Sequence, residues 1–400
     1  MRLNLATILL RAITLVLASA LFTACSPNKS ARPVRLHWDT LALLPPLDHQ
    51  PNPGVAGAFS GVSNGQLMVA GGANFPGKPA WQSGAKKYWN TVYVLPFDHG
   101  TPGRWMDRLF HFPYPVAYGA SLTTSQGIVC IGGKNDSGYL SRVSLLRWND
   151  RLKDIEVKPL ADLPMPLASM AAARIGDTVY IAGGENKQGK QDGFYRLNLQ
   201  DPSAHWERLP ALPAGALSDA VLASQLYREH LCLYLIGGRT AEHDGVTTFY
   251  NTVYRFDPVK GGWSPCHGIT GTEGKPVTLA AGTGIAVGDH YILLIGGDDG
   301  RLFNQLATLK RKSVSGDDST QKKYWHARYD SLFIHHPGFD RNIYLYNTQT
   351  DAWKRLDNLP FPTPATTNIF RYDDRIMIPS GEIRPGVRTA AIFSAKILKE

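Results

Sequence analysis

Short apolar stretches recur along the whole chain, separated by small or polar residues, and most of them end in a pair of glycines. Each stretch has only four or five residues, which is typical of a buried strand and too short for a buried helix. The pairs are Gly71-Gly72, Gly132-Gly133, Gly183-Gly184, Gly237-Gly238 and Gly296-Gly297, and Ser380-Gly381 marks a sixth, degenerate copy. The first five pairs are spaced by roughly 50 to 60 residues, so the chain is built from structural repeats.

The segments around each glycine pair supply the other strands of a repeat. Before the pair lies a run of small residues, such as residues 54–60 and 168–173, which suits an innermost strand crowded around a central axis. After the pair come aromatic-bearing strands and a tryptophan, at Trp105, Trp206, Trp263 and Trp353. A tryptophan that recurs at one repeat position is expected to pack between repeats. A period near 50 residues with a glycine doublet is typical of kelch motifs, in which each repeat forms one four-stranded propeller blade.

One predicted outer strand, residues 36–45, has no blade before it, and the sixth repeat ends at its third strand, residues 389–397. Pairing these two strands would close the ring and remove an exposed edge. We therefore predict an all-β, six-bladed kelch-type β-propeller over residues 34–400, closed by the N-terminal strand. The 39 glycines and 27 prolines fit a fold with many tight turns.

Two connections are unusually long. The interval between the fifth and sixth repeats has an excess in residues 301–340, and the first repeat has a long connection over residues 74–89. Long ordered insertions often act as lids or binding loops, but a solvated surface loop is the alternative.

The first 25 residues have the features of an export leader. Arg2 and Arg11 precede an apolar core, residues 12–22, that is too short to span a membrane. Residues 21–26 resemble a bacterial lipoprotein cleavage box with Cys25 as the lipidated residue; an ordinary leader cleaved near Ala24 is the alternative. We expect a signal peptide over residues 1–25, a tether over 26–33, and a location in the periplasm or cell envelope. Contact with a membrane is expected only through this lipid anchor.

The formal charge of +9 favours either an anionic partner or simply a basic surface. The sequence has no basic helix or arginine-rich stripe of the nucleic-acid-binding type, so that class is excluded. Cys130, Cys232 and Cys266 lack the spacing of a zinc site or a disulfide framework.

The strand directions predict which residues meet at the mouth of the central channel. The innermost strand starts, and the second strand ends, on the same rim of the ring. The residues directly after the doublets therefore gather there, together with those that start the inner strands: Ala73, Lys134, Glu185, Arg239, Asp298, Glu382, Tyr118, Ser169 and Asp219. Ionisable groups that converge on a pocket are the default binding site, although they also pair with one another, as Arg239 and Asp298 could. From this argument we expect substrate contacts from Asn74, Tyr118, Glu185 and Arg239.

The loop at residues 379–389 differs from the other five copies. It continues from the degenerate doublet into Glu382, Arg384 and Arg388, and Pro385 and Gly386 turn the loop between them. An arginine presents a planar fork that matches a carboxylate, and a carboxyl group among apolar walls can exchange protons near neutral pH. These groups suit an anionic, hydroxylated substrate; the alternative for Glu382 and Arg388 is a salt bridge that only holds the loop.

Residues 381–389, with residues 54–61 and 70–76, resemble the bacterial N-acetylneuraminate epimerases, kelch propellers also called sialic acid mutarotases. The similarity extends from about Val34 to the end of the chain and includes residues 304–346. Relative to the better-known periplasmic members the chain looks circularly permuted, with the blade that carries Glu382 last. A closed ring tolerates permutation because its termini meet in one blade.

The resemblance implies an isomerase that interconverts the α and β anomers of N-acetylneuraminate, or of a related acidic sugar, by acid/base ring opening. It implies catalytic roles for Glu382 and its neighbour Arg388, and Arg384 is added as a substrate-binding residue. No metal or other cofactor is implied.

Two other functions remain open on the sequence. Kelch rings often bind partners without turnover, so a non-catalytic carbohydrate- or protein-binding propeller is the main alternative. An oxidase would need a copper site of tyrosine and histidine, but the adjacent His335 and His336 would point to opposite faces of a strand.

Overall fold

The computed structural model describes residues 34–47, 50–98, 101–241 and 245–398. Leu36–Ile397 forms one compact unit. The predicted leader, the tether and Cys25 lie outside the described residues. Within those residues, no helix combines the length and apolar character needed to cross a membrane.

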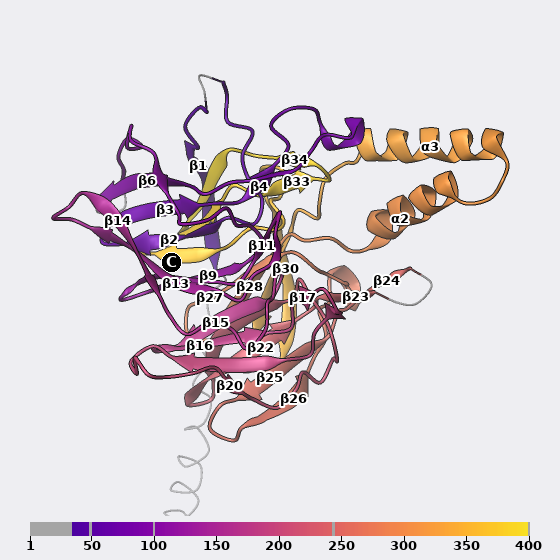
Figure 1. Cartoon of the computed structure of the whole chain (residues 1–400). Helices are drawn as coiled ribbons and strands as arrows, with labels where there is room; N and C mark the ends of the chain where they lie inside the picture. Colours follow the sequence, from indigo (N-terminus) through magenta and orange to yellow (C-terminus); the bar gives the residue numbers. More distant parts are fainter. Residues whose placement is uncertain (1–33, 48–49, 99–100, 242–244, 399–400) are drawn as a thin grey trace, which may run out of the picture. The chain divides into compact units, whose positions relative to one another are not determined.

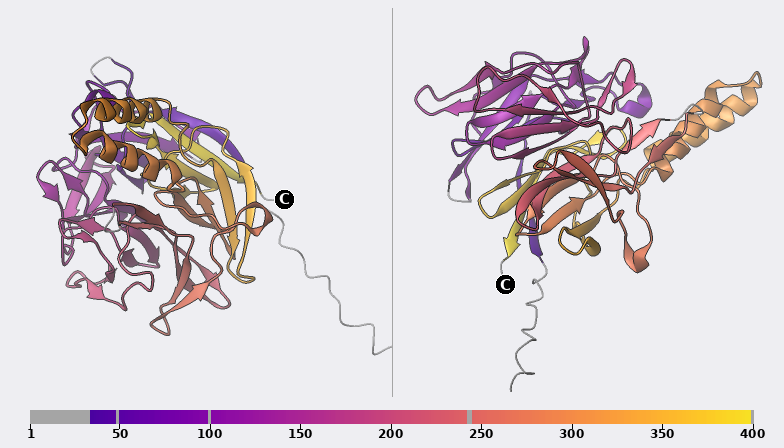
Figure 2. Two further views of the ribbon diagram at one scale, coloured as in Figure 1. Left: turned by 90° about the vertical axis from the view of Figure 1, so that its right-hand side faces the viewer. Right: turned by 90° about the horizontal axis from the view of Figure 1, so that it is seen from below.

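The unit Leu36–Ile397 is a six-bladed β-propeller, which confirms the predicted fold. Figures 1 and 2 show its sheets following one another around a central axis in chain order. From the centre outward, the first blade comprises β2 (Phe59–Ser63), β3 (Gln66–Ala70), β6 (Thr91–Asp98) and β7 (Thr101–Pro102), and β8 (Phe110–His111) also pairs with β6. The second blade comprises β9 (Ala120–Thr124), β10 (Gly127–Ile131), β13 (Val143–Asn149) and β14 (Asp154–Pro159). The third blade comprises β15 (Ala171–Ile175), β16 (Thr178–Ala182), β19 (Phe194–Asn198) and β20 (Glu207–Arg208).

The remaining three blades follow the same order. The fourth blade comprises β21 (Val221–Tyr227), β22 (His230–Ile236), β25 (Val253–Asp257) and β26 (Gly262–Cys266). The fifth blade comprises β27 (Thr283–Val287), β28 (Tyr291–Ile295), β29 (Asn342–Asn347) and β30 (Ala352–Asn358). The sixth blade comprises β31 (Phe370–Tyr372), β32 (Arg375–Pro379), β35 (Ala391–Leu398) and β1 (Arg35–Leu43). In the sixth blade the N-terminal strand β1 is outermost, so the ring closes as predicted.

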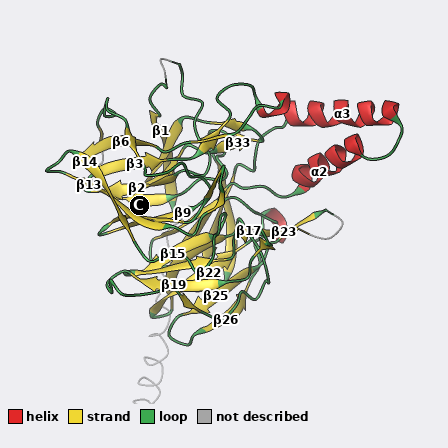
Figure 3. Cartoon of the chain, in the orientation of Figure 1, coloured by secondary structure: helices red, strands yellow, loops and turns green. Residues whose placement is uncertain are grey.

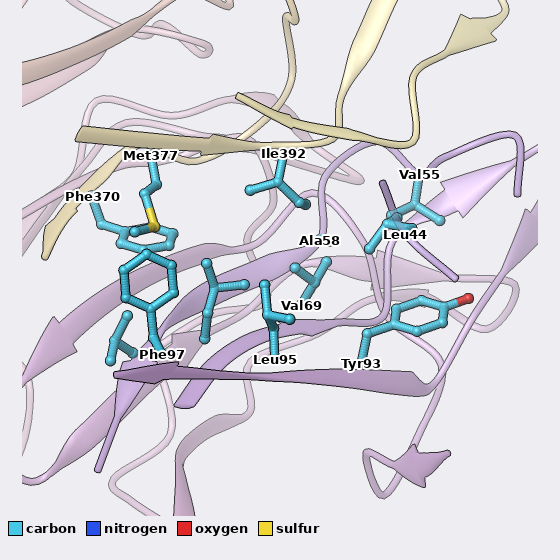
Figure 4. Close-up of a cluster of buried hydrophobic side chains, with 12 residues drawn as sticks. Leu44, Val55, Ala58, Val69, Tyr93, Leu95, Phe97, Phe370, Met377 and Ile392 are labelled. Carbon is cyan, nitrogen blue, oxygen red and sulfur yellow. The ribbon is translucent and has the colours of Figure 1, made fainter. Parts of the chain in front are cut away.

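The sixth blade, in which β1 pairs with β35, packs against the first blade through apolar side chains. Figure 4 shows Phe370, Met377 and Ile392 of the sixth blade against side chains of the first blade, including Leu95 and Phe97. Burial of such side chains contributes about 1.5–3 kcal/mol each. The apolar stretches recognised in the sequence therefore hold the two ends of the chain together.

The recurring tryptophans connect neighbouring blades, as predicted. The indole N–H of each donates to a backbone carbonyl of the preceding blade: Trp105 to Leu43, Trp206 to Ala161, Trp263 to Pro210 and Trp353 to His267. The distances are 2.8, 2.9, 3.2 and 3.0 Å, respectively. The second blade has no such tryptophan and uses β14 as its outer strand.

A closed ring of six backbone hydrogen bonds surrounds the propeller axis. One residue of each blade donates its N–H to the carbonyl of the equivalent residue in the preceding blade, at 2.7 to 3.3 Å: Gly57 to Thr366, Tyr118 to Gly57, Ser169 to Tyr118, Asp219 to Ser169, Ala281 to Asp219, and Thr366 to Ala281. All six have positive φ, between 47° and 68°, which costs a residue with a side chain roughly 1–2 kcal/mol. We call these six residues the axial ring.

A two-stranded hairpin follows the glycine doublet in most blades and rises from the same rim. The hairpins are β4 (Ala73–Asn74) with β5 (Lys87–Tyr88), β11 (Lys134–Asn135) with β12 (Gly138–Tyr139), β17 (Glu185–Asn186) with β18 (Gly189–Lys190), β23 (Arg239–Ala241) with β24 (Thr247–Phe249), and β33 (Glu382–Arg384) with β34 (Val387–Arg388). In the fifth blade two helices occupy this position.

The predicted insertion at residues 301–340 folds into these helices, α2 (Arg301–Val314) and α3 (Ser319–Ile334). Asp318 caps α3 by accepting hydrogen bonds from the N–H groups of Thr320 and Gln321, which is a strong N-terminal signal. The helices project from the strands (Figure 3). The long connection of the first blade contains the short helix η1 (Ala80–Gln82), which packs against α3.

We expect Gly57→Ala to destabilise the protein more than Gly176→Ala. Both glycines have positive φ, 68° and 58°, so both alanines carry a similar backbone cost of about 1 kcal/mol. A Cβ at residue 57 would lie 2.5 Å from the Tyr118 nitrogen, whereas at residue 176 it would meet nothing within 4 Å. Urea unfolding of the two variants measures the difference, which we expect to exceed about 1 kcal/mol. Equal losses would show that the axial ring does not need a bare backbone at residue 57.

Candidate active site

A pocket of about 530 Å³ lies on one side of the axial ring. A smaller cavity of about 140 Å³, lined by the inner strands, lies on the other side. The two cavities share the axial-ring residues Tyr118, Ser169, Asp219, Ala281 and Thr366. The ring therefore forms the floor of the larger pocket.

The residues after the glycine doublets occupy equivalent places around this pocket. Each forms one isolated backbone bridge to a residue that precedes an inner strand: Ala56 with Ala73, Ala117 with Lys134, Ala168 with Glu185, Ser218 with Arg239, Ala280 with Asp298, and Ala365 with Glu382. All of the ionisable residues in this set line the pocket. The structure thus brings together the rim residues that the strand directions predicted.

Glu382 and Arg388 face each other across the β33–β34 hairpin and both line the pocket. Arg388 Nη1 lies 3.3 Å from Glu382 Oε1, and the same oxygen accepts a hydrogen bond of 2.7 Å from the Gly386 N–H. The Arg388 side chain is only 3% exposed, and its guanidinium lies 4.8 Å from the centre of the Phe75 ring.

Arg388 has unused hydrogen-bonding capacity. Its Nε and Nη1 atoms are buried and have no hydrogen-bond acceptor among the described residues, because the contact with Glu382 lacks hydrogen-bond geometry. A buried donor without an acceptor costs roughly 1–3 kcal/mol. A bound carboxylate or hydroxyl group would remove this cost.

Tyr118 belongs to the axial ring and lies beneath two lysines. Lys86 Nζ is 5.1 Å, and Lys134 Nζ 5.4 Å, from the centre of its ring. Tyr88 packs edge-on against it at 6.4 Å. Tyr118 thus presents an aromatic face and a phenol to the pocket.

Glu185 is held between two cations. Its carboxylate lies 3.0 Å from Lys134 Nζ and 3.4 Å from Lys190 Nζ. Burial by itself would raise the pKa of Glu185, but the charges of Lys134 and Lys190 and the hydrogen bond from Lys134 lower it below the usual value. Burial opposes the charge on Lys134 as well, yet Glu185 raises its pKa overall. Both groups are therefore charged at neutral pH.

Arg239 pairs with Asp219 and not with Asp298, which corrects the pairing suggested by the sequence. Arg239 Nε donates to Asp219 Oδ2 at 2.9 Å. Asp219 is strongly buried, which disfavours its charge, but Arg239, Ser218 and Lys190 lower its pKa overall. Asp298 is left without an ion pair among the described residues, and burial raises its pKa.

Asn74 and Arg384 lie outside the pocket lining. Asn74 is 1% exposed; its amide donates to the Gly54 carbonyl at 2.8 Å and accepts the Trp89 indole N–H at 2.8 Å. These bonds give Asn74 a structural role in the first blade. Arg384 donates to the Ile334 carbonyl at the end of α3, and its guanidinium lies 5.5 Å from the centre of the Trp81 ring.

Several lining residues were not identified from the sequence. They come from the two long segments: Phe75, Ala80 and Lys86 from the first blade, and Phe303, Leu306, Ala307, Lys310, Tyr329, Phe333 and Phe339 from the insertion and its exit. The signal available was the length of these segments and their aromatic and lysine content. Lys86 and Lys310 form no ion pair with a described residue, so both remain available to an anion.

The described residues contain one group of side chains with the spacing of metal ligands, His230, Cys232 and Asp257. This group lies on β22 and β25 and does not line the pocket. Asp257 Oδ1 already accepts the N–H groups of Val259 and Lys260. The adjacent histidines of the oxidase alternative lie after α3 and not on a strand: His335 caps the helix, and His336 accepts the Gly338 N–H.

Comparisons with known proteins identify related sequences. The sequence model of the N-acetylneuraminate epimerase family matches residues 17–155 and 160–400. N-acetylneuraminate epimerases of Haemophilus influenzae (strain PittEE) and Salmonella paratyphi B are 28% and 26% identical over 235 and 241 residues. These alignments cover 59% of this chain and 58% of each relative, so the chain spans less than two thirds of the curated relatives' length. The solved structure of YjhT matches 60% of this chain and 64% of its own, at 24% identity and a TM-score of 0.48. The circular permutation stays a prediction.

We expect Glu185→Gln to lower the free energy of unfolding by about 1 kcal/mol at pH 7. The folded-state pKa of Glu185 lies below its ordinary value of 4.5. Its ion pairs therefore stabilise the fold above that pH, and the contribution is lost as the pH falls through the lowered value. Urea unfolding at pH 7 and near pH 3 measures the change.

The control is Glu207→Gln, which removes an exposed ion pair with Arg196 and should have a smaller effect. A loss for Glu185→Gln of the same size at both pH values would contradict the electrostatic interpretation.

Proposed function

This chain belongs to the N-acetylneuraminate epimerase family, and from that premise we propose that it interconverts the α and β anomers of N-acetylneuraminate or a closely related acidic sugar. The observation that carries the proposal is the pairing of Glu382 with the buried Arg388, at 3.3 Å, in the pocket over the axial ring. A carboxylate for proton transfer and a guanidinium with unused donors are the groups that an acidic hemiketal requires.

Arg388 binds the carboxylate of the sugar. Its Nε and Nη1 donors have no acceptor among the described residues, and a guanidinium fork matches a carboxylate through two hydrogen bonds. Phe75 lies against the guanidinium and keeps it from turning toward solvent. Lys86 and Lys310 add positive charge to the pocket, which favours an anionic sugar over a neutral one.

Glu382 acts on the anomeric hydroxyl. Removal of the hydroxyl proton, with protonation of the ring oxygen, breaks the bond from C2 to the ring oxygen and gives the open-chain keto acid. Rotation about the C2–C3 bond followed by ring closure produces the other anomer. The reaction is neutral overall, so the protein supplies only positioned acid/base groups and a site that excludes water.

Apolar residues of the insertion line part of the pocket and support this role. Phe303, Leu306 and Phe333 contribute apolar surface to a lining that is otherwise rich in charge. Apolar walls lower the local dielectric and so strengthen the interactions of Glu382 and Arg388 with substrate.

The proposal is tested by proton NMR of freshly released α-N-acetylneuraminate, with and without the protein. We expect the protein to accelerate the approach to the anomeric equilibrium. Glu382→Gln should lower the catalysed mutarotation rate by at least about 100-fold without abolishing binding, since a general acid/base group contributes a rate factor of about 10²–10⁴. Arg388→Lys should weaken binding by about tenfold or more, because the charge is kept but the fork is lost.

The matched control is Glu273→Gln, whose carboxylate is 70% exposed and pairs only with Lys275 among the described residues; its rate should equal that of the unaltered protein. Substrate line broadening without acceleration would instead favour the non-catalytic carbohydrate-binding propeller. If the protein causes neither acceleration nor line broadening, N-acetylneuraminate is excluded as its ligand.

We also propose that the chain is exported and anchored by a lipid on Cys25. The support is the sequence of residues 1–26, with its basic start, short apolar core and cysteine after a small residue. In a Gram-negative host fed labelled palmitate, the full chain should incorporate label and sediment with membranes. Cys25→Ser should lose both properties, and Cys266→Ser should keep them. Export of an unlabelled protein cleaved near Ala24 would contradict the anchor and leave export standing.

A further inference from the structure

Among the described residues, four carboxyl groups line the pocket: Glu185, Asp219, Asp298 and Glu382. Three of them lie within ion-pair distance of a cation, namely Lys134, Arg239 and Arg388. Asp298 is the exception among the described residues. Its Oδ1 atom accepts the Gly300 N–H at 2.8 Å; no described residue forms a hydrogen bond or ion pair with its other oxygen.

Asp298 and Glu382 occupy the same position in neighbouring blades. Asp298 follows the doublet of the fifth blade and bridges to Ala280, and Glu382 follows the doublet of the sixth blade and bridges to Ala365. Ala281 and Thr366, the next residues after those bridge partners, are linked by a hydrogen bond of the axial ring. The two carboxyl groups therefore enter the pocket from neighbouring blades, one step of the axial ring apart.

We propose that Asp298 is the second catalytic group of the site and donates the proton to the ring oxygen of the sugar while Glu382 accepts the proton of the anomeric hydroxyl. This inference rests on the proposed function and adds to it the group that completes the proton transfer.

The two carboxyl groups balance the reaction without proton exchange with solvent. In ring opening, the proton of the anomeric hydroxyl moves to Glu382, its electron pair forms the C2 carbonyl, and the bond from C2 to the ring oxygen breaks as that oxygen takes the Asp298 proton. In ring closure, Asp298 accepts the proton of the attacking hydroxyl, and Glu382 returns its proton to the carbonyl oxygen. Both groups end in their starting state.

The surroundings of Asp298 fit a proton donor. Burial raises its pKa, and the neighbouring Asp299 acts in the same direction; the Gly300 N–H and the charge of Arg239 oppose them without reversing the shift. Glu382 differs in its surroundings, because Arg388 Nη1 lies 3.3 Å from its carboxylate. A carboxyl group beside a cation and a carboxyl group without one suit a base and an acid in one site. The other ionisable side chains of the described pocket lining are Lys86, Tyr118, Lys134, Glu185, Asp219, Lys310, Tyr329, Glu382 and Arg388.

The test compares Asp298→Asn with Asp289→Asn, the same chemical change in an exposed turn at the opposite end of the fifth blade. For the active protein we expect Asp298→Asn to lower the mutarotation rate by about 100-fold while binding of N-acetylneuraminate, measured by NMR titration, changes less than about threefold. Asp289→Asn should change neither quantity.

The pH dependence separates proton donation from a structural effect. In the unaltered protein the rate should fall as the pH rises through the raised pKa of Asp298, and this fall should be absent in Asp298→Asn. Asp298→Glu, which restores a carboxyl group, should recover part of the rate and the fall with rising pH. Circular dichroism and thermal unfolding show whether each variant is folded.

Three results would overturn the inference. If the unaltered protein is active and Asp298→Asn keeps its rate within about threefold, Asp298 is not the proton donor and the proposed function stands. If Asp298→Asn is slow but its rate still falls with rising pH as in the unaltered protein, the aspartate acts only through the structure of the pocket. A lack of mutarotation by the unaltered protein removes the proposed function and this inference together.

Discussion

The axial ring of six backbone hydrogen bonds is the constraint on which the candidate site depends. It joins one residue of every blade at 2.7 to 3.3 Å and forces all six into the left-handed region. Only Gly57 among them lacks a side chain, so the backbone cost at the other five is met by the packing of the blades. Because the ring fixes where each inner strand begins, it also fixes the six equivalent positions that follow the glycine doublets. The floor of the pocket and the origin of its charged side chains follow from this one arrangement.

The charges of the pocket divide into fixed and available groups. Lys134 with Glu185 and Arg239 with Asp219 pair with one another and keep their partners charged. Such pairs hold side chains in place and have little capacity left for a ligand. Arg388 and Asp298 differ, because Arg388 has donors without acceptors and Asp298 has no cation within ion-pair distance among the described residues. Asp298 and Arg388 lie in the fifth and sixth blades, and Lys86 of the first blade and Lys310 of the insertion are the other available charged groups among the described residues.

The insertion is tied to the hairpin that carries Glu382. Trp81 packs against Phe333 of α3 at 6.3 Å, and Arg384 connects the β33–β34 hairpin to the end of α3 through the Ile334 carbonyl. Arg384 lies outside the pocket lining and contacts α3 and Trp81, and its role in substrate binding stays a prediction. Through these contacts the first blade, the fifth-blade insertion and the sixth-blade hairpin enclose one pocket.

Three features could be predicted from the sequence: the six blades, their closure by the N-terminal strand, and the rim positions of Lys134, Glu185, Arg239, Asp298 and Glu382. They were predictable because each repeat shows the same pattern of strands and turns, and the strand directions then fix which strand ends share a rim. The partner of each charged group became known from the folded structure alone. Arg239 forms an ion pair with Asp219 and not with Asp298, and Asn74 is hydrogen-bonded to the Gly54 carbonyl and the Trp89 indole. The sequence could not predict these contacts, because they depend on side-chain rotamers and on chain segments distant in sequence. The helical fold of residues 301–334 and the contribution of Lys310 to the pocket were likewise decided by packing between an insertion and blades that no repeat pattern describes.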